Sequence, residues 1–359
     1  MAIARCIGFL GADWWGSDAR AMAMEFRRQG CILLERHYED YFSTRLRGPG
    51  SRLVRRLTRP LVVREYNRAV LELLAVEALD FLLVFKGMLL QPSTLKKFAE
   101  RGLPSYLVYP DVSFHDHGHN ISACLPLYDA VFTTKSFHLD DHEVKRKAKD
   151  LRLIRHGFDP EVHRPVAFSE DLAEEYGCDV SFVGNWSAKK EQLLAAVVRH
   201  FPDIKLRVWG PNWARAQMDI RRRWSGRGAY GDELAAIYSY SRINLGLLSE
   251  AGTGNTRGDQ LTARSWQIPA SGGLLLHEDT AEIRQFFVPG REMAVFSDSD
   301  DLVRKIQELL NDEQVCQAMR RAGQERCRSS AYTYAPAVAA VLAYDSGRRG
   351  ASAQPGPVT

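Results

Sequence analysis

The sequence has 359 residues, of which 45% are hydrophobic and 26% are charged. This is the composition of a folded globular protein rather than a disordered or fibrous one, and the length suits about two domains. The net charge of +4 is small, so charge alone does not indicate a nucleic-acid-binding protein. The six cysteines are scattered without a C-x-x-C pair, which indicates reduced thiols rather than a disulfide scaffold.

The first apolar run, residues 6–10, begins almost at the start of the sequence. It is not preceded by the charged, apolar and cleavage regions of a signal peptide. Apolar runs such as residues 81–85 have the length of a buried strand and not that of a membrane-spanning helix. We therefore expect a cytoplasmic protein.

In the first half, short apolar runs alternate with helical stretches, which is typical of strands buried on both faces of a parallel sheet. The predicted strands cover residues 6–11, 31–34, 80–85, 105–109, 130–133 and 151–154. Residues 156–165 are rich in turn formers and predict a linker.

The second half repeats this pattern. Its predicted strands cover residues 179–184, 204–209, 242–247, 273–276 and 293–296. Predicted helices cover residues 190–200, 232–239 and 280–287, and two closing helices follow at 300–310 and 313–329. Two successive βαβ series predict an α/β protein with two Rossmann-like, doubly wound domains that face each other across a cleft. We expect domains at residues 1–165 and 166–345, followed by a disordered tail at 346–359.

Residues 257–282 have the features of a site for a nucleoside diphosphate at the carboxyl edge of a parallel sheet. The guanidinium groups of Arg257 and Arg264 suit phosphate oxygens, and Gly272 and Gly273 would allow backbone N–H groups to approach them. A further cation would come from Lys189 or Lys190, although both lysines also fit the solvated face of a helix. The alternative for the whole segment is an ordinary helix–turn–strand connection.

The base of the nucleotide is predicted to lie near two other turns. Trp209 and Gly210 end one predicted strand, and Tyr230 precedes a predicted helix. Glycine allows a ring to approach the backbone closely. The alternative is that these aromatic side chains belong to the core, as most do.

Two acidic loops at strand ends could supply a base that accepts the proton of an acceptor hydroxyl. They contain Asp13 and Asp111, with His115 and His117 behind Asp111. The alternative for Asp111 is that it caps a turn. His115, His117 and His119 alternate and could bind zinc, but no further ligand follows at a suitable spacing, so we expect surface histidines and no metal.

Seven arginines and no acidic residue lie between Arg45 and Arg64, interleaved with apolar residues. A basic amphipathic segment of this kind can lie on an anionic membrane surface. A solvated helix face or a site for a phosphate-bearing acceptor would explain it as well. Elsewhere charges of both signs are mixed, so we expect no nucleic-acid partner.

Several segments together resemble the CgeB-type glycosyltransferase-like family, which belongs among the GT-B glycosyltransferases. They are CDVSFVGNW (178–186), AYGDELAAIYSYSRINLGL (229–247), SWQIPASGGLLLHED (265–279), FFVPGREMAVFSDSDDLVRKI (286–306), GADWWGSDA (11–19), DFLLVFKG (80–87) and YDAVFTTKSF (128–137). The resemblance implies a metal-independent GT-B enzyme whose second domain binds a nucleotide-sugar donor and whose first domain holds most of the acceptor. The donor is then a co-substrate, and no cofactor is needed.

The resemblance also implies roles for three residues of the second half. Asp259 and Gln267 occupy the positions of the paired glutamates of retaining GT-B enzymes, and Asn185 joins them at the donor site. Gln267 can hydrogen-bond a ribose hydroxyl but cannot accept hydrogen bonds as a carboxylate does. A retaining mechanism therefore does not follow.

The resulting prediction is a glycosyltransferase that moves a sugar from a nucleoside-diphosphate donor to a hydroxyl of a glycan, a lipid-linked precursor or a small molecule. One alternative is a non-catalytic protein of the same fold that binds nucleotide sugar or glycan in surface or coat assembly. Another is a nucleotide-sugar epimerase built on the same two domains.

Overall fold

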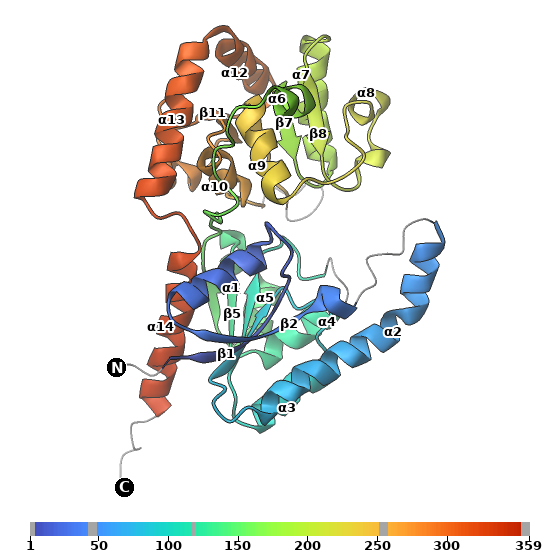
Figure 1. Cartoon of the computed structure of the whole chain (residues 1–359), viewed down its shortest axis with the longest axis vertical. Coiled ribbons are helices and arrows are strands. Elements are labelled where there is room, and N and C mark those ends of the chain that lie inside the picture. Colours follow the sequence, from blue (N-terminus) through green and yellow to red (C-terminus); the bar gives the residue numbers. More distant parts are fainter. Residues whose placement is uncertain (1–3, 42–48, 116–118, 251–257, 353–359) are drawn as a thin grey trace. The chain divides into compact units, whose positions relative to one another are not determined.

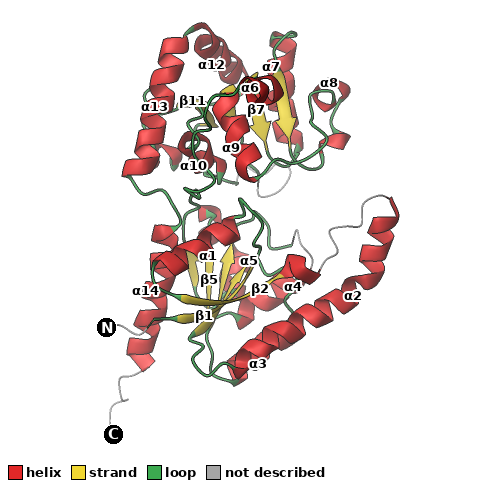
Figure 2. Cartoon of the chain, viewed as in Figure 1, coloured by secondary structure: helices red, strands yellow, loops and turns green. Residues whose placement is uncertain are grey.

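The chain forms two α/β units, each described below by itself. The computed structural model describes residues 4–41, 49–115, 119–250 and 258–352. The first unit comprises Met1–Arg155 and Tyr334–Thr359, and the second comprises His156–Thr333. Each unit contains a sheet flanked by helices, shown as yellow and red ribbons in Figure 2.

The first unit contains a parallel six-stranded sheet with the order β2-β1-β3-β4-β5-β6. Its strands are β1 (Cys6–Gly11), β2 (Ile32–His37), β3 (Phe81–Phe85), β4 (Ser105–Tyr109), β5 (Ala130–Thr133) and β6 (Leu151–Leu153). Its α-helices are α1 (Asp18–Arg28), α2 (Pro49–Leu71), α3 (Pro92–Glu100), α4 (His119–Cys124), α5 (His142–Lys147) and α14 (Ala335–Ser352). Because β2 and β3 lie on opposite sides of β1, the carboxyl ends of β1 and β3 form a topological switch point.

The second unit contains a parallel five-stranded sheet with the order β11-β10-β9-β7-β8. Its strands are β7 (Cys178–Val183), β8 (Leu206–Trp209), β9 (Ser241–Gly246), β10 (Leu275–Glu278) and β11 (Ala294–Phe296). Its α-helices are α6 (Glu170–Tyr176), α7 (Ala188–His200), α8 (Met218–Arg221), α9 (Gly231–Tyr240), α10 (Arg264–Ala270), α11 (Ile283–Phe286), α12 (Ser299–Asn311) and α13 (Glu313–Ser329). Here the switch point lies between β7 and β9, because β8 and β9 flank β7 on opposite sides.

Short 3₁₀ helices complete the described elements. They are η1 (Tyr38–Tyr41), η2 (Glu72–Ala75), η3 (Leu125–Leu127), η4 (Ser136–Asp140) and η5 (Trp213–Arg215). Within the described ranges, no helix is both long enough and apolar enough to cross a bilayer.

The strands inside each sheet are buried on both faces, as their continuous apolar sequences predict, whereas β2 and β6 at the edges of the first sheet are partly exposed. In β3, Leu82 and Val84 enter the core on one face of the sheet, whereas Phe81, Leu83 and Phe85 enter the core on the other. In β10, Leu276 and Leu275 likewise belong to two different cores of the second unit. The predicted parallel α/β class is confirmed, because every predicted strand has a counterpart within a few residues of its expected position.

The last helix differs from the prediction. Residues 334–345 were expected to belong to the second domain and residues 346–359 to be disordered, but α14 extends to Ser352 and belongs to the first unit. The reason is its apolar side, where Ala337, Val338 and Val341 are buried in the same core as α1 and β1. Figure 1 shows this red helix beside the blue elements of the first unit.

Buried polar contacts also fix α14. The carboxylate of Asp345 is fully buried, accepts a hydrogen bond of 2.9 Å from the Tyr106 hydroxyl and pairs with Arg349 at 2.8 Å. Arg349 in turn pairs with Asp80 at 2.7 Å. The units consequently divide at Arg155 and His156 rather than at residue 165, and residues 353–359 lie outside the described part.

Candidate functional site

Two cationic side chains meet at the switch point of the second unit. Arg264, the first residue of α10, donates from Nη1 to the Val183 carbonyl at 3.3 Å and from Nη2 to the Leu247 carbonyl at 2.5 Å. Val183 ends β7 and Leu247 follows β9, so the guanidinium group spans the carboxyl ends of both strands. These two bonds use two of its five N–H donors, and Nε is buried without a hydrogen-bond partner among the described residues.

The second cation is Lys190, in the first turn of α7. Ser187 caps this helix by accepting from the Lys190 N–H, and the Lys190 ammonium group donates to the Ser249 hydroxyl at 2.8 Å and the Asn185 carbonyl at 3.3 Å. Ser249 follows β9, whereas Asn185 follows β7, so Lys190 bridges the same two strand ends as Arg264. The ring of Phe182 lies 5.3 Å from the Arg264 guanidinium carbon and 6.0 Å from the Lys190 nitrogen.

Burial makes these cations costly. Burial of the Lys190 side chain and, to a smaller extent, the positive charge of Arg264 lower the pKa of Lys190 to about 7. Burial also lowers the pKa of Arg264. The carboxylates of Asp259 and Glu278 offset only part of this cost. An anion bound at this edge would stabilise both charged forms, so the arrangement suits a phosphate-bearing ligand.

The predicted residue Lys189 has a different partner. Its ammonium group lies 2.5 Å from Glu278 Oε2, and Glu278 Oε1 accepts from the Leu248 N–H at 2.6 Å. Glu278 ends β10, so this pair also lies at the carboxyl edge of the sheet. Lys189 thus neutralises a carboxylate. Lys190, by contrast, is the lysine whose pKa the charge of Arg264 lowers.

The predicted role of the Gly-Gly turn is corrected by the structure. Gly272 and Gly273 precede β10 and therefore lie at its amino end, away from the carboxyl edge. Their N–H groups donate to the carbonyls of Pro269 and Ile268, at 2.9 Å and 3.0 Å, so neither is available for a phosphate. Glycine is needed for conformation and space: Gly272 has φ of +74°, and a Cβ at Gly273 would lie 2.7 Å from the Tyr238 carbonyl oxygen.

Trp209 is likewise a core residue, as the alternative interpretation held. Its side chain is buried within the second unit, with the Arg207 guanidinium 4.7 Å from its ring. Gly210 has φ of +131°, and a Cβ there would lie 2.0 Å from the Gly184 carbonyl oxygen. The glycine therefore lets the ends of β7 and β8 approach each other.

Other predicted donor residues lie nearer to the carboxyl edge. Tyr230 is exposed at the position before α9, and Asn185 is exposed in the loop after β7. Asp259 is buried, and its N–H donates to the Ser249 carbonyl at 2.8 Å, which brings it beside the residue that binds Lys190. Gln267 is buried within α10, one turn after Arg264.

Two predicted residues, Arg257 and His117, lie outside the described residues. His115 pairs with Glu143 at 3.5 Å, and His119 begins α4. Among the side chains that the structure does describe, no group of three or more His, Cys, Asp or Glu is arranged to hold a metal ion.

The carboxyl edge of the first unit carries the predicted acids. Asp111 follows β4, and its Oδ2 lies 2.7 Å from the ammonium group of Lys86, which follows β3. Asp13 follows β1; its side chain is exposed, with Oδ1 3.9 Å from Arg20 Nε. The predicted position of both acids at strand ends is therefore correct.

Sequence reasoning missed a third acid, Asp18, in the first turn of α1. Its pKa is raised to about 6, mainly by burial and to a smaller extent by the nearby charge of Asp111. A hydrogen bond with Tyr334 and the charges of Lys135 and Lys86 act in the opposite direction. In the sequence, Ser17-Asp18 is a common start of a helix. The groups that shift the pKa of Asp18 follow β3, β4 and β5 or precede α14, and the sequence does not show that these segments meet around Asp18.

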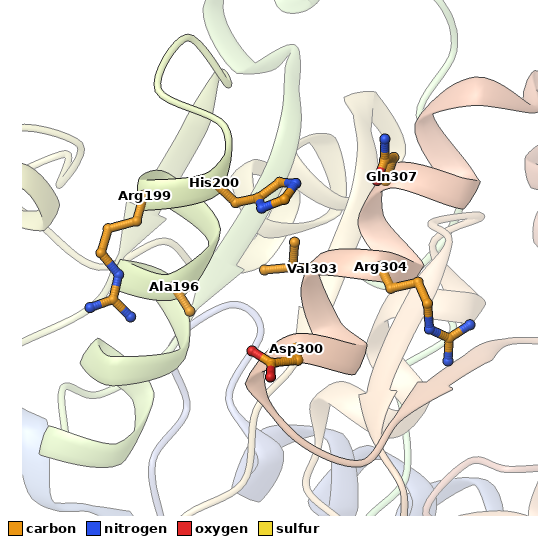
Figure 3. A pocket seen from close by; sticks show the side chains of 7 residues that line it. All are labelled: Ala196, Arg199, His200, Asp300, Val303, Arg304 and Gln307. Carbon is orange, nitrogen blue, oxygen red and sulfur yellow. The ribbon is translucent and has the colours of Figure 1, made fainter.

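A cavity of about 460 Å³ lies elsewhere in the second unit, between α7 and α12. It is lined by Ala196, Arg199, His200, Asp300, Val303, Arg304 and Gln307 (Figure 3). The guanidinium groups of Arg199 and Arg304 point to opposite sides of the cavity in Figure 3, and Arg304 already pairs with Glu308 at 2.7 Å. None of the residues described above at the carboxyl edge lines this cavity, so we do not place the site there.

The two parallel sheets with flanking helices are those of the GT-B glycosyltransferases. Sucrose-phosphate synthase from Thermosynechococcus elongatus has a TM-score of 0.62 at 14% identity, covering 97% of this chain and 100% of that chain. HepE from Anabaena, in complex with UDP and glucose, has a TM-score of 0.59 at 12% identity, covering 95% and 100%. A Listeria monocytogenes protein assigned as a UDP-N-acetylglucosamine 2-epimerase has a TM-score of 0.52 at 11% identity, covering 100% of both chains.

Sequence comparison adds a family to the fold. Residues 168–343 match the family described as "Glycosyl transferase-like", a range that includes all five strands of the second sheet and the first half of α14. Among curated proteins, no sequence matches this chain. The matched range covers most of the second unit, which carries Lys190 and Arg264.

Proposed function

We propose that the protein is a glycosyltransferase of the CgeB type, which transfers a sugar from a nucleoside-diphosphate donor to an acceptor hydroxyl. The observation that carries this proposal is the placement of Arg264 and Lys190 on the switch point of the glycosyltransferase-like unit. Ligands of open parallel sheets bind at such points. HepE, which shares the fold, was solved with UDP and glucose, which supports a nucleotide sugar as the donor class.

The donor site is proposed to work through fixed positive charge. When the glycosidic bond to the diphosphate breaks, negative charge develops on the leaving oxygen, and Lys190 and Arg264 would stabilise it without reorganisation. Lys189 contributes to the same field, and Arg257 keeps its predicted role outside the described residues. Asp259, Gln267 and Asn185 are proposed to contact the nucleoside, with Gln267 on the ribose, and Tyr230 to lie against the base.

The acceptor site is proposed to lie on the first unit, with a carboxylate as general base. Asp111 and Asp13 were predicted for this role, together with His117, but the ammonium group of Lys86 holds Asp111 in an ion pair. Asp18 suits the role better, since its raised pKa of about 6 gives a carboxylate that is basic near neutral pH and still ionised. We therefore propose Asp18 as the base, with the charges of Asp111 and Lys86 adjusting its pKa.

We propose that no metal ion takes part in this reaction, because side-chain cations provide the charge on the diphosphate. Turnover that survives treatment with EDTA supports this part of the proposal. Loss of turnover that is restored by Mg²⁺ or Mn²⁺ would contradict it.

A further part of the proposal is peripheral contact with the inner face of an anionic membrane through α2. Leu57 and Leu61 are 69% and 63% exposed, and they share one face of the helix with the exposed Val54. By the same periodicity, the exposed Arg56 and Arg59 lie on the opposite side. An apolar stripe with a basic polar face is the pattern of helices that lie in a membrane interface.

A nucleotide-sugar epimerase is the second candidate, because the Listeria protein shares the fold over the whole chain. A non-catalytic binding protein is the third, favoured by Gln267 in place of the glutamate that the resemblance implies. The three differ in their products: a transferase needs an acceptor, an epimerase converts its donor alone, and a binder shows saturation without turnover.

The test begins with a thermal-shift screen against UDP-, GDP-, ADP- and dTDP-sugars, since a ligand that binds only the folded protein raises its Tm. The donor that binds is then incubated with and without acceptor mixtures, and the products are separated by mass spectrometry. No stabilisation by any nucleotide sugar would refute the proposed function.

A further inference from the structure

Two adjacent tryptophans are exposed at the switch point of the first unit. Trp14 and Trp15 lie in the turn between β1 and α1, and their exposed fractions are 42% and 41%. Tryptophan combines a large flat apolar surface with one hydrogen-bond donor, and it is enriched where proteins bind partners or ligands. Two exposed tryptophans in succession on a short turn indicate a binding surface.

The turn that carries these rings is well fixed. The Ser17 N–H donates to the Trp14 carbonyl at 3.0 Å, and the Ser17 hydroxyl donates to the Ala12 carbonyl at 3.1 Å. At the other end, the Asp13 N–H donates to Glu39 at 2.5 Å. The rings are therefore presented by an ordered backbone, so little conformational entropy is lost when a ligand binds.

Charged groups lie beside the Trp15 ring and at the start of the turn. The Arg20 guanidinium carbon lies 4.6 Å from the centre of the Trp15 ring, and Arg20 Nε lies 3.9 Å from Asp13 Oδ1. Glu39 adds a second carboxylate beside Asp13. An acyl chain or an apolar protein surface would remove these charges from water without giving them hydrogen bonds.

A pyranose ring fits both parts of this surface. Its C–H face can stack on an indole ring, while its equatorial hydroxyls reach outward to carboxylate and guanidinium groups. Sites of this composition, with aromatic surfaces and a few well-placed polar groups, are typical of small-molecule recognition. The chemistry of the turn thus selects a carbohydrate over a lipid tail.

The position of the turn supports the same ligand. It follows β1 at the switch point between β1 and β3, where ligands of open parallel sheets bind, and it leads directly into Asp18. A sugar held on Trp14 and Trp15 would therefore lie at the strand end from which the chain enters α1, the helix that begins with Asp18.

We propose that Trp14 and Trp15 form the acceptor-binding surface and that the acceptor is a carbohydrate, bound by stacking of a pyranose face on the indole rings. This inference rests on the proposed function and names its acceptor class. Of the acceptor classes that the sequence left open, it selects the glycan.

The test uses the full-length chain labelled with 5-fluorotryptophan. The chain has seven tryptophans, and Trp14→Phe and Trp15→Phe identify the two ¹⁹F signals of the turn. Maltotetraose, cellotetraose and chitotetraose are titrated separately, and vesicles of phosphatidylcholine with phosphatidylglycerol form a lipid arm. At least one oligosaccharide is expected to shift these two signals, and vesicles are expected to leave them in place.

Variants then separate stacking from folding. Trp14→Ala is expected to weaken binding of that oligosaccharide by about tenfold, as expected for the loss of one aromatic contact, whereas Trp14→Phe should retain most of it. Phe168→Ala is the matched control, since Phe168 is an exposed aromatic residue of the second unit. The inference is overturned if no oligosaccharide shifts the two signals, if vesicles alone shift them, or if Trp14→Ala binds as tightly as the wild type.

A separate measurement of donor binding distinguishes failure of this inference from failure of the proposed function. Binding of UDP-glucose is measured by calorimetry for the wild type and for Trp14→Ala, and both are expected to give the same Kd. Oligosaccharide binding without any nucleotide-sugar binding would support the carbohydrate surface and refute the transferase. Donor turnover with an unchanged KM for the oligosaccharide in Trp14→Ala would support the transferase and refute the carbohydrate surface.

Discussion

Replacing Lys190 by methionine tests the proposed donor site most directly. Methionine keeps the length of the aliphatic chain but removes the ammonium group, which lies at the β7 and β9 strand ends beside Arg264. A hydrogen bond to a charged partner contributes about 1.5–3 kcal/mol, so we expect Lys190→Met to bind UDP-sugars about 10- to 150-fold more weakly.

The same substitution should not lower stability. Burial lowers the pKa of Lys190 from 10.5 to about 7. At neutral pH this corresponds to a cost of about 4–5 kcal/mol for burying the lysine. The variant also loses two hydrogen bonds of the charged ammonium group, to Ser249 and Asn185, worth about 1.5–3 kcal/mol each, which is similar to the cost removed. We therefore expect a Tm close to that of the wild type.

The pH dependence of binding follows from the same group. A bound diphosphate favours the charged form of Lys190, so its pKa rises above about 7 on binding and protons are taken up near neutral pH. Affinity for the donor should therefore fall as the pH rises above about 7, and Lys190→Met should lose this component.

Calorimetric titration with UDP and UDP-glucose at pH 6, 7 and 8, in two buffers of different ionisation enthalpy, measures both affinity and proton uptake. Lys305→Met is the control, because Lys305 lies on α12 and pairs with Glu308 at 2.8 Å. Unchanged UDP-glucose affinity in Lys190→Met would refute the reasoning. A fall in Tm together with affinity would instead show that Lys190 has a structural role.

Three further predictions test other parts of the molecule. Asp18→Asn should lower kcat with an acceptor by roughly 10²- to 10⁴-fold, while the Kd for the donor stays unchanged. Wild-type kcat should fall below pH 6, where Asp18 is protonated, and a wild-type kcat that does not fall below pH 6 would contradict this role. Val341→Ala should lower the free energy of unfolding by about 2 kcal/mol in chemical denaturation, because Val341 is fully buried in the first unit; an unchanged midpoint would show that α14 does not stabilise that core. Leu57→Glu combined with Leu61→Glu should abolish co-sedimentation with anionic vesicles without changing Tm, because both side chains are exposed; equal sedimentation of the variant would remove α2 from the membrane proposal.

The sequence predicted much of the local structure, because periodicity and burial are local properties. A run such as residues 81–85 is apolar at every position, which identifies a strand covered on both faces. The placement of Asp13, Asp111 and Lys190 at strand ends followed from the same pattern. Edge strands and turns were less regular, and their boundaries moved by a few residues.

The assignment of α14 to the first unit could not be predicted from such local patterns. Its residues follow the second unit in the sequence, and their spacing shows an apolar side without showing which core that side joins. Only packing decides this, since Val338 and Val341 are buried with α1 and β1.

The same distinction between local and tertiary information applies to the functional groups. The sequence by itself determined the α/β class, the succession of strands and the residue types available at their carboxyl ends, since these depend on neighbours along the chain. Only the tertiary structure decided that Gly272 and Gly273 lie at the amino end of β10 and that Lys190 and Arg264 meet at one switch point. It also decided that Asp18 is surrounded by groups from distant strands, because burial and charge depend on neighbours in space.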